Sequence, residues 1–189
     1  QYCFDKDVLE IGTGQGYGVY YLSKVAKTVT GIDIRPNSIE PIQAYRDAHG
    51  IKNINFACAN GIYLPFADKT FDRIITCQVI EHIPEDNLVH FLGELSRVLK
   101  DDGCLFISTL NIEHNIKNKK TYEKFIEHHK EFTTSELKSL LSKVFSKLRL
   151  CGLNITLKHR FFLRLKRWGF LKYDFFGINP VRRFFNIVS

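Results

Sequence analysis

The stretch Asp7–Gly18, DVLEIGTGQGYG, decides the fold of this chain. An apolar run leads into glycines at positions 12, 14, 16 and 18, and Tyr17–Val25 then has the length and composition of a helix. Because glycine has no Cβ, such a loop turns tightly and lets a ligand approach the backbone. The free N–H groups at the start of the next helix favour polar ligand groups. The pattern predicts the nucleotide-binding corner of a doubly wound α/β domain.

The glycine spacing argues against a dinucleotide site. The dinucleotide fingerprint G-x-G-x-x-G needs glycine at its sixth position. That position is Tyr17 when the count starts at Gly12, and Val19 when it starts at Gly14. A second apolar run ends in Asp33, about twenty residues after the loop, where a carboxylate can accept both ribose hydroxyls of a nucleotide.

Short apolar, β-branched runs alternate with helix-length segments along most of the chain. We expect buried strands at Asp7–Ile11, Thr28–Asp33, Asn53–Cys58, Arg73–Cys77 and Cys104–Thr109, and helices at Tyr17–Val25, Asn37–His49 and Glu85–Leu99. Alternating βα units predict a parallel sheet with ligands at the carboxyl ends of its strands. Further on, Thr133–Glu136 is a predicted capping box for a helix at Ser135–Val144, and Phe145–Cys151 is a candidate sixth strand. The polar segment Asn111–Glu131 leaves the ligand side of the fifth strand and either caps a pocket or forms a solvated loop.

A series of motifs in a fixed order resembles the class I S-adenosylmethionine-dependent methyltransferases, and in particular the type 11-like branch often linked to glycan biosynthesis. These motifs are E-x-G-x-G-x-G at Glu10–Gly16, LPFADKTFDRII at Leu64–Ile75, QVIEHI at Gln78–Ile83, RVLKDDG at Arg97–Gly103 and HHKEFT at His128–Thr133. They cover Val8 to about Phe145. The resemblance implies a Rossmann-like, doubly wound, mostly parallel sheet, and S-adenosyl-L-methionine as cofactor. Since the expected elements include neither the helix that usually precedes the first strand nor the last strand of the closing β-hairpin, we expect a chain truncated at both ends.

The resemblance also implies the cofactor-binding residues: Glu10, Gly12, Thr13, Gly14, Gly16, Asp33, Ile34, Asn60, Gly61 and Gln78. The glycine loop and Glu10 would hold the methionine end of the cofactor. Asp33 would bind the ribose hydroxyls and Ile34 would pack on the adenine. Asn60, where the family often has Asp, would offer its amide oxygen to the adenine amino group. Gln78 would offer its carbonyl to the ammonium group.

Two histidines are candidate catalytic residues. Histidine is a common general base in enzymes, and His82 could accept a proton from a hydroxyl or amine acceptor. A structural hydrogen bond is the alternative for the Glu81–His82 pair. Of His128 and His129, one would act as base or substrate contact, and we select His129. Positioning of donor and acceptor alone supplies much of the rate of a methyl transfer, so a general base is optional.

Composition fits one domain followed by a basic segment. The chain has 189 residues, 44% of them hydrophobic, and a net charge of +7. Residues 146–189 hold ten of the 27 basic residues but only one of the 20 acidic ones, which leaves 17 basic and 19 acidic residues before them. We therefore predict a methyltransferase domain at 1–156 and a basic aromatic segment at 157–189. Its apolar residues Leu157, Phe161, Leu165 and Trp168 share one helical face, which predicts a membrane-surface element, a helix packed on the domain, or a nucleic-acid patch.

The cysteines and the absence of a nucleic-acid methyltransferase motif limit the classes of function that we expect. Five scattered cysteines without a C-x-x-C pair favour reduced thiols in a cytoplasmic protein, and we predict no metal site. We expect a methyltransferase acting on a hydroxyl, amine or carbon of a small molecule or a glycan or lipid-linked saccharide, with peripheral contact at the inner face of the membrane. An RNA methyltransferase and a non-catalytic cofactor-binding domain are the alternatives. Nucleic acid is disfavoured, because no N/D-P-P-Y/F motif follows the fourth strand. Neither the acceptor nor the oligomeric state follows from the sequence.

Overall fold

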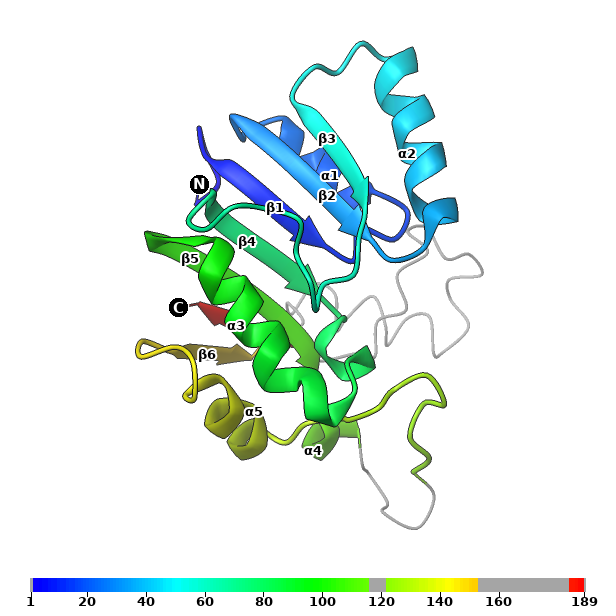
Figure 1. Ribbon diagram of the computed structural model, residues 1–189. Coiled ribbons are helices and arrows are strands. Elements are labelled where there is room, and N and C mark those ends of the chain that lie inside the picture. The colour runs from blue at the N-terminus through cyan, green and yellow to red at the C-terminus, as the bar shows by residue number, and fades with distance from the viewer. Residues whose placement is uncertain (1, 116–121, 153–183, 189) are drawn as a thin grey trace, which may run out of the picture.

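The fold is a single seven-stranded sheet with helices on both faces (Figure 1). The computed structural model describes residues 2–115, 122–152 and 184–188. Within these ranges the strands follow the order β3-β2-β1-β4-β5-β7-β6 across the sheet. Their bounds are Asp7–Ile11 (β1), Thr28–Asp33 (β2), Ile54–Cys58 (β3), Phe71–Cys77 (β4), Leu99–Leu110 (β5), Arg149–Gly152 (β6) and Phe184–Val188 (β7). Strands β1 to β5 pair in parallel, which confirms the predicted doubly wound sheet.

The closing strand β7 corrects one expectation. It lies antiparallel between β5 and β6, with Ile187 opposite both Ile107 and Leu150. The sequence does not predict this strand, because FFNIV stands at the end of a basic, aromatic stretch, far along the chain from the strands with which it pairs. Residues 184–188 therefore belong to the sheet, although they lie beyond the predicted domain boundary at 156. The predicted amphipathic helix from Leu157 to Trp168 lies outside the described residues.

Helices connect the strands close to their predicted positions. Their bounds are Tyr17–Ser23 (α1), Pro36–Ala48 (α2), Leu88–Val98 (α3), Ile112–Asn115 (α4) and Thr134–Leu141 (α5), with 3₁₀ turns at Ile80–His82 (η1) and Glu85–Asn87 (η2). The predicted helix from Glu85 thus starts as η2 and becomes α-helical at Leu88. The capping box is confirmed: the Thr133 hydroxyl accepts the Glu136 N–H, and the Glu136 carboxylate accepts the Thr133 N–H.

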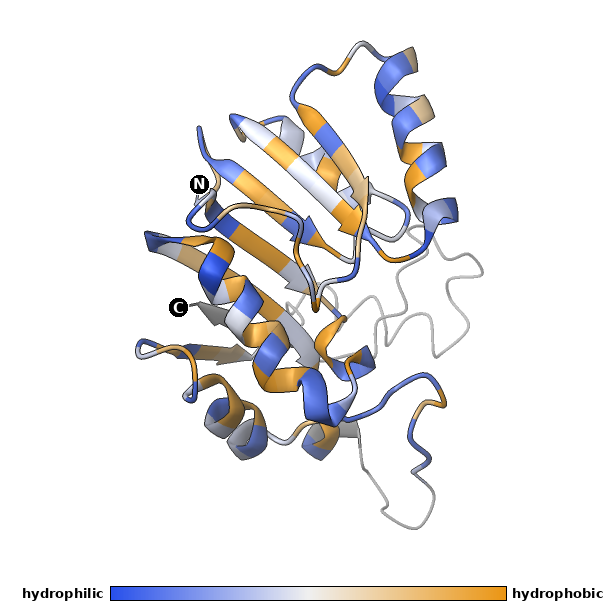
Figure 2. Ribbon diagram, viewed as in Figure 1, coloured by the Kyte–Doolittle hydropathy of each residue, from blue (hydrophilic) through white to orange (hydrophobic). Residues whose placement is uncertain are grey.

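Two apolar cores lie on the two faces of the sheet. Alternating side chains of β1 divide between them, with Val8 in one cluster and Leu9 in the other. The larger core joins the sheet to α3 and α5, and the smaller one joins it to α1 through Val19. Figure 1 shows α3 and α5 in front of the sheet with α1 behind it, and Figure 2 shows hydrophobic residues along the central strands that these helices cover. The buried sheet holds the carboxyl ends of β1, β2 and β4 together at one edge.

One strand begins earlier than predicted. The pairing of β4 with β5 steps from Phe71–Leu99 to Arg73–Cys104, so residues 100–103 form an irregularity within β5. The sequence predicts a strand only from Cys104. The turn residues are present, but Leu99 on their far side still pairs with the sheet.

Candidate functional site

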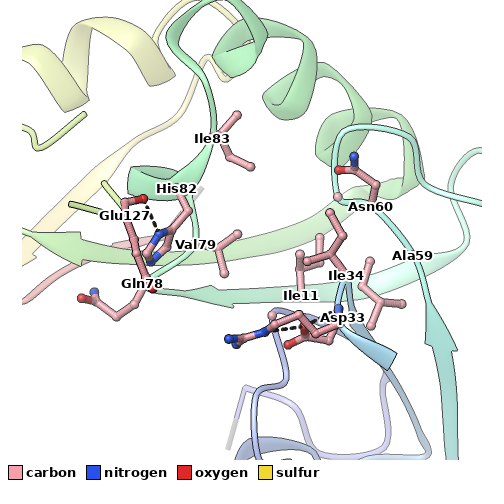
Figure 3. A pocket seen from close by; sticks show the side chains of 14 residues that line it. Ile11, Asp33, Ile34, Ala59, Asn60, Gln78, Val79, His82, Ile83 and Glu127 are labelled. Carbon is pink, nitrogen blue, oxygen red and sulfur yellow. Dashed lines mark hydrogen bonds and ion pairs between the residues drawn. The ribbon is translucent and has the colours of Figure 1, made fainter. Parts of the chain in front are cut away.

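A pocket of about 410 Å³ opens at the carboxyl ends of the parallel strands. Its walls come from the exits of β1, β2, β3 and β4 and from the segment before α5: Ile11, Gly12, Ile32, Asp33, Ile34, Arg35, Ala59, Asn60, Gly61, Gln78, Val79, His82, Ile83 and Glu127. In Figure 3, Asp33, Ile34 and Asn60 lie at one end of the pocket, and His82 and Glu127 lie at the other. This is where a doubly wound sheet binds its ligands.

The glycine loop closes tightly around its neighbours. Gly12 has a φ of 75°, and a Cβ there would overlap the side chain of Val79. A Cβ on Gly18 would overlap the carboxylate of Glu10. Glycine at these two positions is therefore required by space, and at Gly12 by backbone conformation as well. Gly14 and Gly16 also have positive φ.

Glu10 lies beneath this loop and is not among the residues that line the pocket. It is 9% exposed, and burial raises the pKa of its carboxyl to about 7, although the Val19 N–H lowers it in part. Its Oε2 atom and the buried hydroxyl of Thr13 have no hydrogen-bond partner among the described residues. A buried polar atom without a partner costs free energy. Both atoms can therefore take a hydrogen-bond partner that the described part of the chain does not supply.

Asp33 ends β2 with a buried carboxylate that faces the loop. Its Oδ2 accepts the Gly14 N–H at 2.9 Å, and its Oδ1 accepts the Arg35 N–H at 2.9 Å. Each carboxylate oxygen has a further lone pair, so both can still accept hydroxyl donors. The neighbouring Ile34 is 63% exposed, which is unusual for a large apolar side chain in a pocket wall and leaves a surface for a flat apolar group.

The two other predicted contacts lie on separate strand exits. The Asn60 Oδ1 accepts the Ile62 N–H at 3.0 Å, which fixes the side-chain amide of Asn60 at the pocket wall. Gln78 has a φ of 58°, an uncommon conformation for a residue other than glycine, and donates its N–H to Ser108 O at 2.9 Å. The Gln78 side chain points away from Asp33 in Figure 3, so only its backbone faces that end of the pocket.

A second group of polar side chains borders the pocket around η1. His82 lines the pocket, its Nδ1 lies 2.9 Å from Glu127 O, and its ring packs edge-on against that of His128. Glu81 is completely buried; its Oε2 accepts the Thr109 hydroxyl at 2.9 Å, and Oε1 has no partner among the described residues. Burial raises the pKa of the Glu81 carboxyl.

The segment before α5 supplies the other half of this group. The His128 Nδ1 lies 2.7 Å from Glu131 Oε1, and the Tyr122 hydroxyl donates to the other oxygen of Glu131. The exposed His129 donates its backbone N–H to Glu81 O at 2.8 Å, and its side chain does not line the pocket. The structure thus brings His128, rather than His129, to His82. The segment also reaches the pocket through Glu127, a contact that sequence reasoning missed because the Glu127 backbone carbonyl makes the bond.

Comparisons with known proteins agree with this geometry. A family model described as "Methyltransferase domain" matches residues 9–107. A Mycobacterium tuberculosis protein named "Probable S-adenosylmethionine-dependent methyltransferase" is 31% identical over 153 residues, which are 80% of this chain and 53% of that protein. The chain spans about half the length of the curated relatives it matches.

Solved structures share the fold at low sequence identity. A methyltransferase from Aquifex aeolicus, described as dependent on S-adenosylmethionine, superposes with a TM-score of 0.68 at 19% identity, covering 100% of this chain and 83% of the other. The YcgJ protein of a Bacillus species superposes with a TM-score of 0.70 at 19% identity, covering 98% and 92%. Among the described residues there is no helix with the length and apolar character needed to cross a bilayer.

Proposed function

Because the chain belongs to the class I S-adenosylmethionine-dependent methyltransferases, we propose that it transfers a methyl group from S-adenosyl-L-methionine to a hydroxyl, amine or carbon of a small molecule or of a glycan or lipid-linked saccharide. The observation that carries this proposal is the pocket that joins a buried carboxylate suited to ribose, Asp33, to the tight glycine turn at Gly12. This pairing suits a nucleoside cofactor whose adenosine and amino-acid ends lie on different strands.

The described residues fit such a cofactor one group at a time. Asp33 retains lone pairs for the two ribose hydroxyls, and exposed Ile34 offers a surface for the adenine. Asn60 and Gly61 border the adenine end. In this proposal the Gln78 backbone carbonyl receives the ammonium group of the cofactor.

The loop residues Gly12, Thr13, Gly14 and Gly16 enclose the methionine end. Glu10 acts beneath the loop, where its unpartnered oxygen takes a donor from the cofactor or from a bridging water. When bound, the cofactor supplies a methyl group already activated by its sulfonium. The protein's task is then to bind, orient and exclude water, and holding two reactants in line supplies roughly 7–11 kcal/mol of the barrier.

His82 is the residue that we place against the acceptor. Its Nδ1 faces a carbonyl oxygen, which can only accept, so we assign the ring proton to Nδ1. This assignment leaves Nε2 as the ring nitrogen that can act toward the pocket that His82 lines. His82 can use that nitrogen as a base toward a hydroxyl or amine, or as a ligand. The catalytic role of His129 stays a prediction, and His128 is the better-placed partner of His82.

The experiment that tests this function has two stages. Calorimetry on the full chain should show binding of S-adenosylmethionine and S-adenosylhomocysteine, and no binding of NAD⁺. Methyl-labelled cofactor is then incubated separately with small-molecule, lipid and RNA extracts, and mass spectrometry identifies the compound that gains the label. Label in the small-molecule or lipid pool supports the proposal. Binding without transfer to any pool would favour a non-catalytic domain, and transfer to RNA alone would favour the nucleic-acid alternative.

The basic segment adds a proposal about location. The ten basic residues among 146–189 are opposed by one acidic residue, which favours contact with anionic lipid headgroups. We place the protein at the inner membrane face on this charge, close to lipid-linked acceptors.

A further inference from the structure

Three side chains from distant parts of the sequence converge beside the pocket. One ligand atom each from Glu81, His82 and His128 lies within 4.8 Å of the other two. Glu81 and His82 stand on η1 after β4, whereas His128 belongs to the segment before α5. Two imidazoles and one carboxylate form a ligand set that suits divalent transition metals such as zinc, and an open position remains for substrate.

Each of the three side chains already has the outer hydrogen bond that metal ligands need. The Nδ1 atoms of His82 and His128 face Glu127 O at 2.9 Å and Glu131 Oε1 at 2.7 Å. Both rings therefore carry a proton on Nδ1, which leaves Nε2 as the nitrogen that can bind a metal ion. Metal-binding histidines are held in this way by a carbonyl or carboxylate on the far ring nitrogen.

Glu81 supplies an independent observation that favours a cation at this position. Its side chain is completely buried, Oε2 is held by the Thr109 hydroxyl, and Oε1 has no partner among the described residues. A buried carboxylate oxygen without a donor is costly, and a bound cation removes that cost. Glu131 is not the carboxylate ligand that joins His82, because its two oxygens are already engaged by His128 and Tyr122.

We propose that Glu81, His82 and His128 bind one divalent transition-metal ion, whose open position faces the pocket and takes a hydroxyl oxygen of the methyl acceptor. The site deepens the proposed function and rests on it for the acceptor. Ligand atoms of a tetrahedral ion with bonds of roughly 2.0–2.1 Å lie about 3.3 Å apart. The widest separation must therefore shrink by at most about 1.5 Å, which the exposed side chain of His82 can supply. The proposal replaces our expectation of no metal site, which rested on cysteine spacing alone.

Cobalt titration of the metal-free full chain tests the site without any cofactor. Visible absorption of Co²⁺ should reach saturation at one ion per chain, Zn²⁺ should displace the ion, and Mg²⁺ in excess should not. His82→Ala, at an exposed position, should weaken Co²⁺ binding by at least tenfold. His129→Ala is the matched control, because His129 follows the ligand His128 in the sequence but lies outside the cluster. This variant should bind Co²⁺ as tightly as the parent protein.

Two further measurements test the role of Glu81 and the open coordination position. Glu81→Gln should also weaken Co²⁺ binding by at least tenfold. Because Glu81 is buried, circular dichroism is used to test whether this variant folds. If it does not fold, the result for His82→Ala decides the test. Sodium azide, a small anion that occupies open coordination positions, should shift the Co²⁺ spectrum. Saturation at no defined stoichiometry, equal binding by His82→Ala and parent, equal loss in His129→Ala, or displacement by Mg²⁺ would overturn the site. An unchanged spectrum with azide would overturn its open position.

The metal site and the methyltransferase proposal can fail separately. Calorimetry with S-adenosylmethionine is repeated on protein stripped with EDTA, where binding should persist because the cofactor residues lie outside the cluster. Cobalt binding without cofactor binding would refute the proposed function and leave the metal site standing. Cofactor binding without cobalt binding would do the reverse.

Discussion

Replacing Glu10 by glutamine should change how the stability of the cofactor-free protein depends on pH. Burial raises the pKa of the Glu10 carboxyl from 4.5 to about 7 in the folded state. A raised carboxyl pKa means that the folded state prefers the neutral form. The stability contributed by this group is therefore complete below pH 4.5 and is lost as the pH rises through 7.

The size of the effect follows from the shift. Each pKa unit corresponds to about 1.36 kcal/mol, so a shift of about 2.5 units costs about 3 kcal/mol once Glu10 is fully ionised. Between pH 5 and pH 8, the ionisation of Glu10 should lower the free energy of unfolding by about 2.5 kcal/mol. Glutamine has nearly the same shape and cannot ionise, and its amide oxygen can still accept the Val19 N–H.

Urea denaturation at pH 5, 6, 7 and 8, followed by circular dichroism, measures this difference. The parent protein should lose about 2.5 kcal/mol more than Glu10→Gln over this range, and the denaturant slope should be the same for both. Glu40→Gln, which neutralises an exposed carboxylate on α2, is the matched control and should follow the parent. Parallel pH profiles for the parent and Glu10→Gln would refute the reasoning, because the carboxyl would then be ionised at no cost.

Three further predictions address the pocket and the basic segment. Asp33→Ala should weaken S-adenosylmethionine binding by at least tenfold in calorimetry, since a hydrogen bond to a charged group contributes roughly 1.5–3 kcal/mol; unchanged affinity would remove Asp33 from the site. Gly18→Ala should lower thermal stability, because the added methyl overlaps the Glu10 carboxylate, and a melting temperature equal to that of the parent would show that the loop has room. Replacing Lys166 and Arg167 by serine should reduce co-sedimentation with anionic vesicles about tenfold or more, at about 1 kcal/mol for each basic residue near the surface. Equal sedimentation would end the membrane proposal, and this variant preserves β7, which a deletion of 157–189 would remove.

Most of the fold could be predicted from the sequence, because each strand and helix is indicated by residues within it or next to it. Each parallel strand is a short apolar run, and Gly12 and Asp33 stand directly at strand exits where the sheet must place them together. The observed strand bounds differ from the predicted ones where pairing between strands outweighs the local sequence pattern. Leu99 is an example, because it pairs with the sheet despite the turn residues after it. The strand at 184–188 was missed for a related reason. Its place between β5 and β6 is set by partners far away in sequence.

The cofactor half and the acceptor half of the site differ in this respect. Cofactor residues occupy the ends of consecutive strands, so spacing alone predicts which of them meet. The other half depends on Glu81 and His82 meeting His128, 46 residues after His82, across a segment with no regular spacing.

The Glu–His pair alone was consistent with a base or a structural hydrogen bond. Only the position of His128, and the acceptors on both Nδ1 atoms, makes a metal ion the stronger interpretation. The choice between His128 and His129 illustrates the same point. The two are adjacent and chemically identical, and the backbone bond from the His129 N–H to Glu81 O accompanies an arrangement in which His128 enters the cluster and the His129 side chain stays exposed. The sequence motifs therefore identify the residues that bind the methyl donor. The residues around the methyl acceptor come together through contacts between segments that no single motif joins.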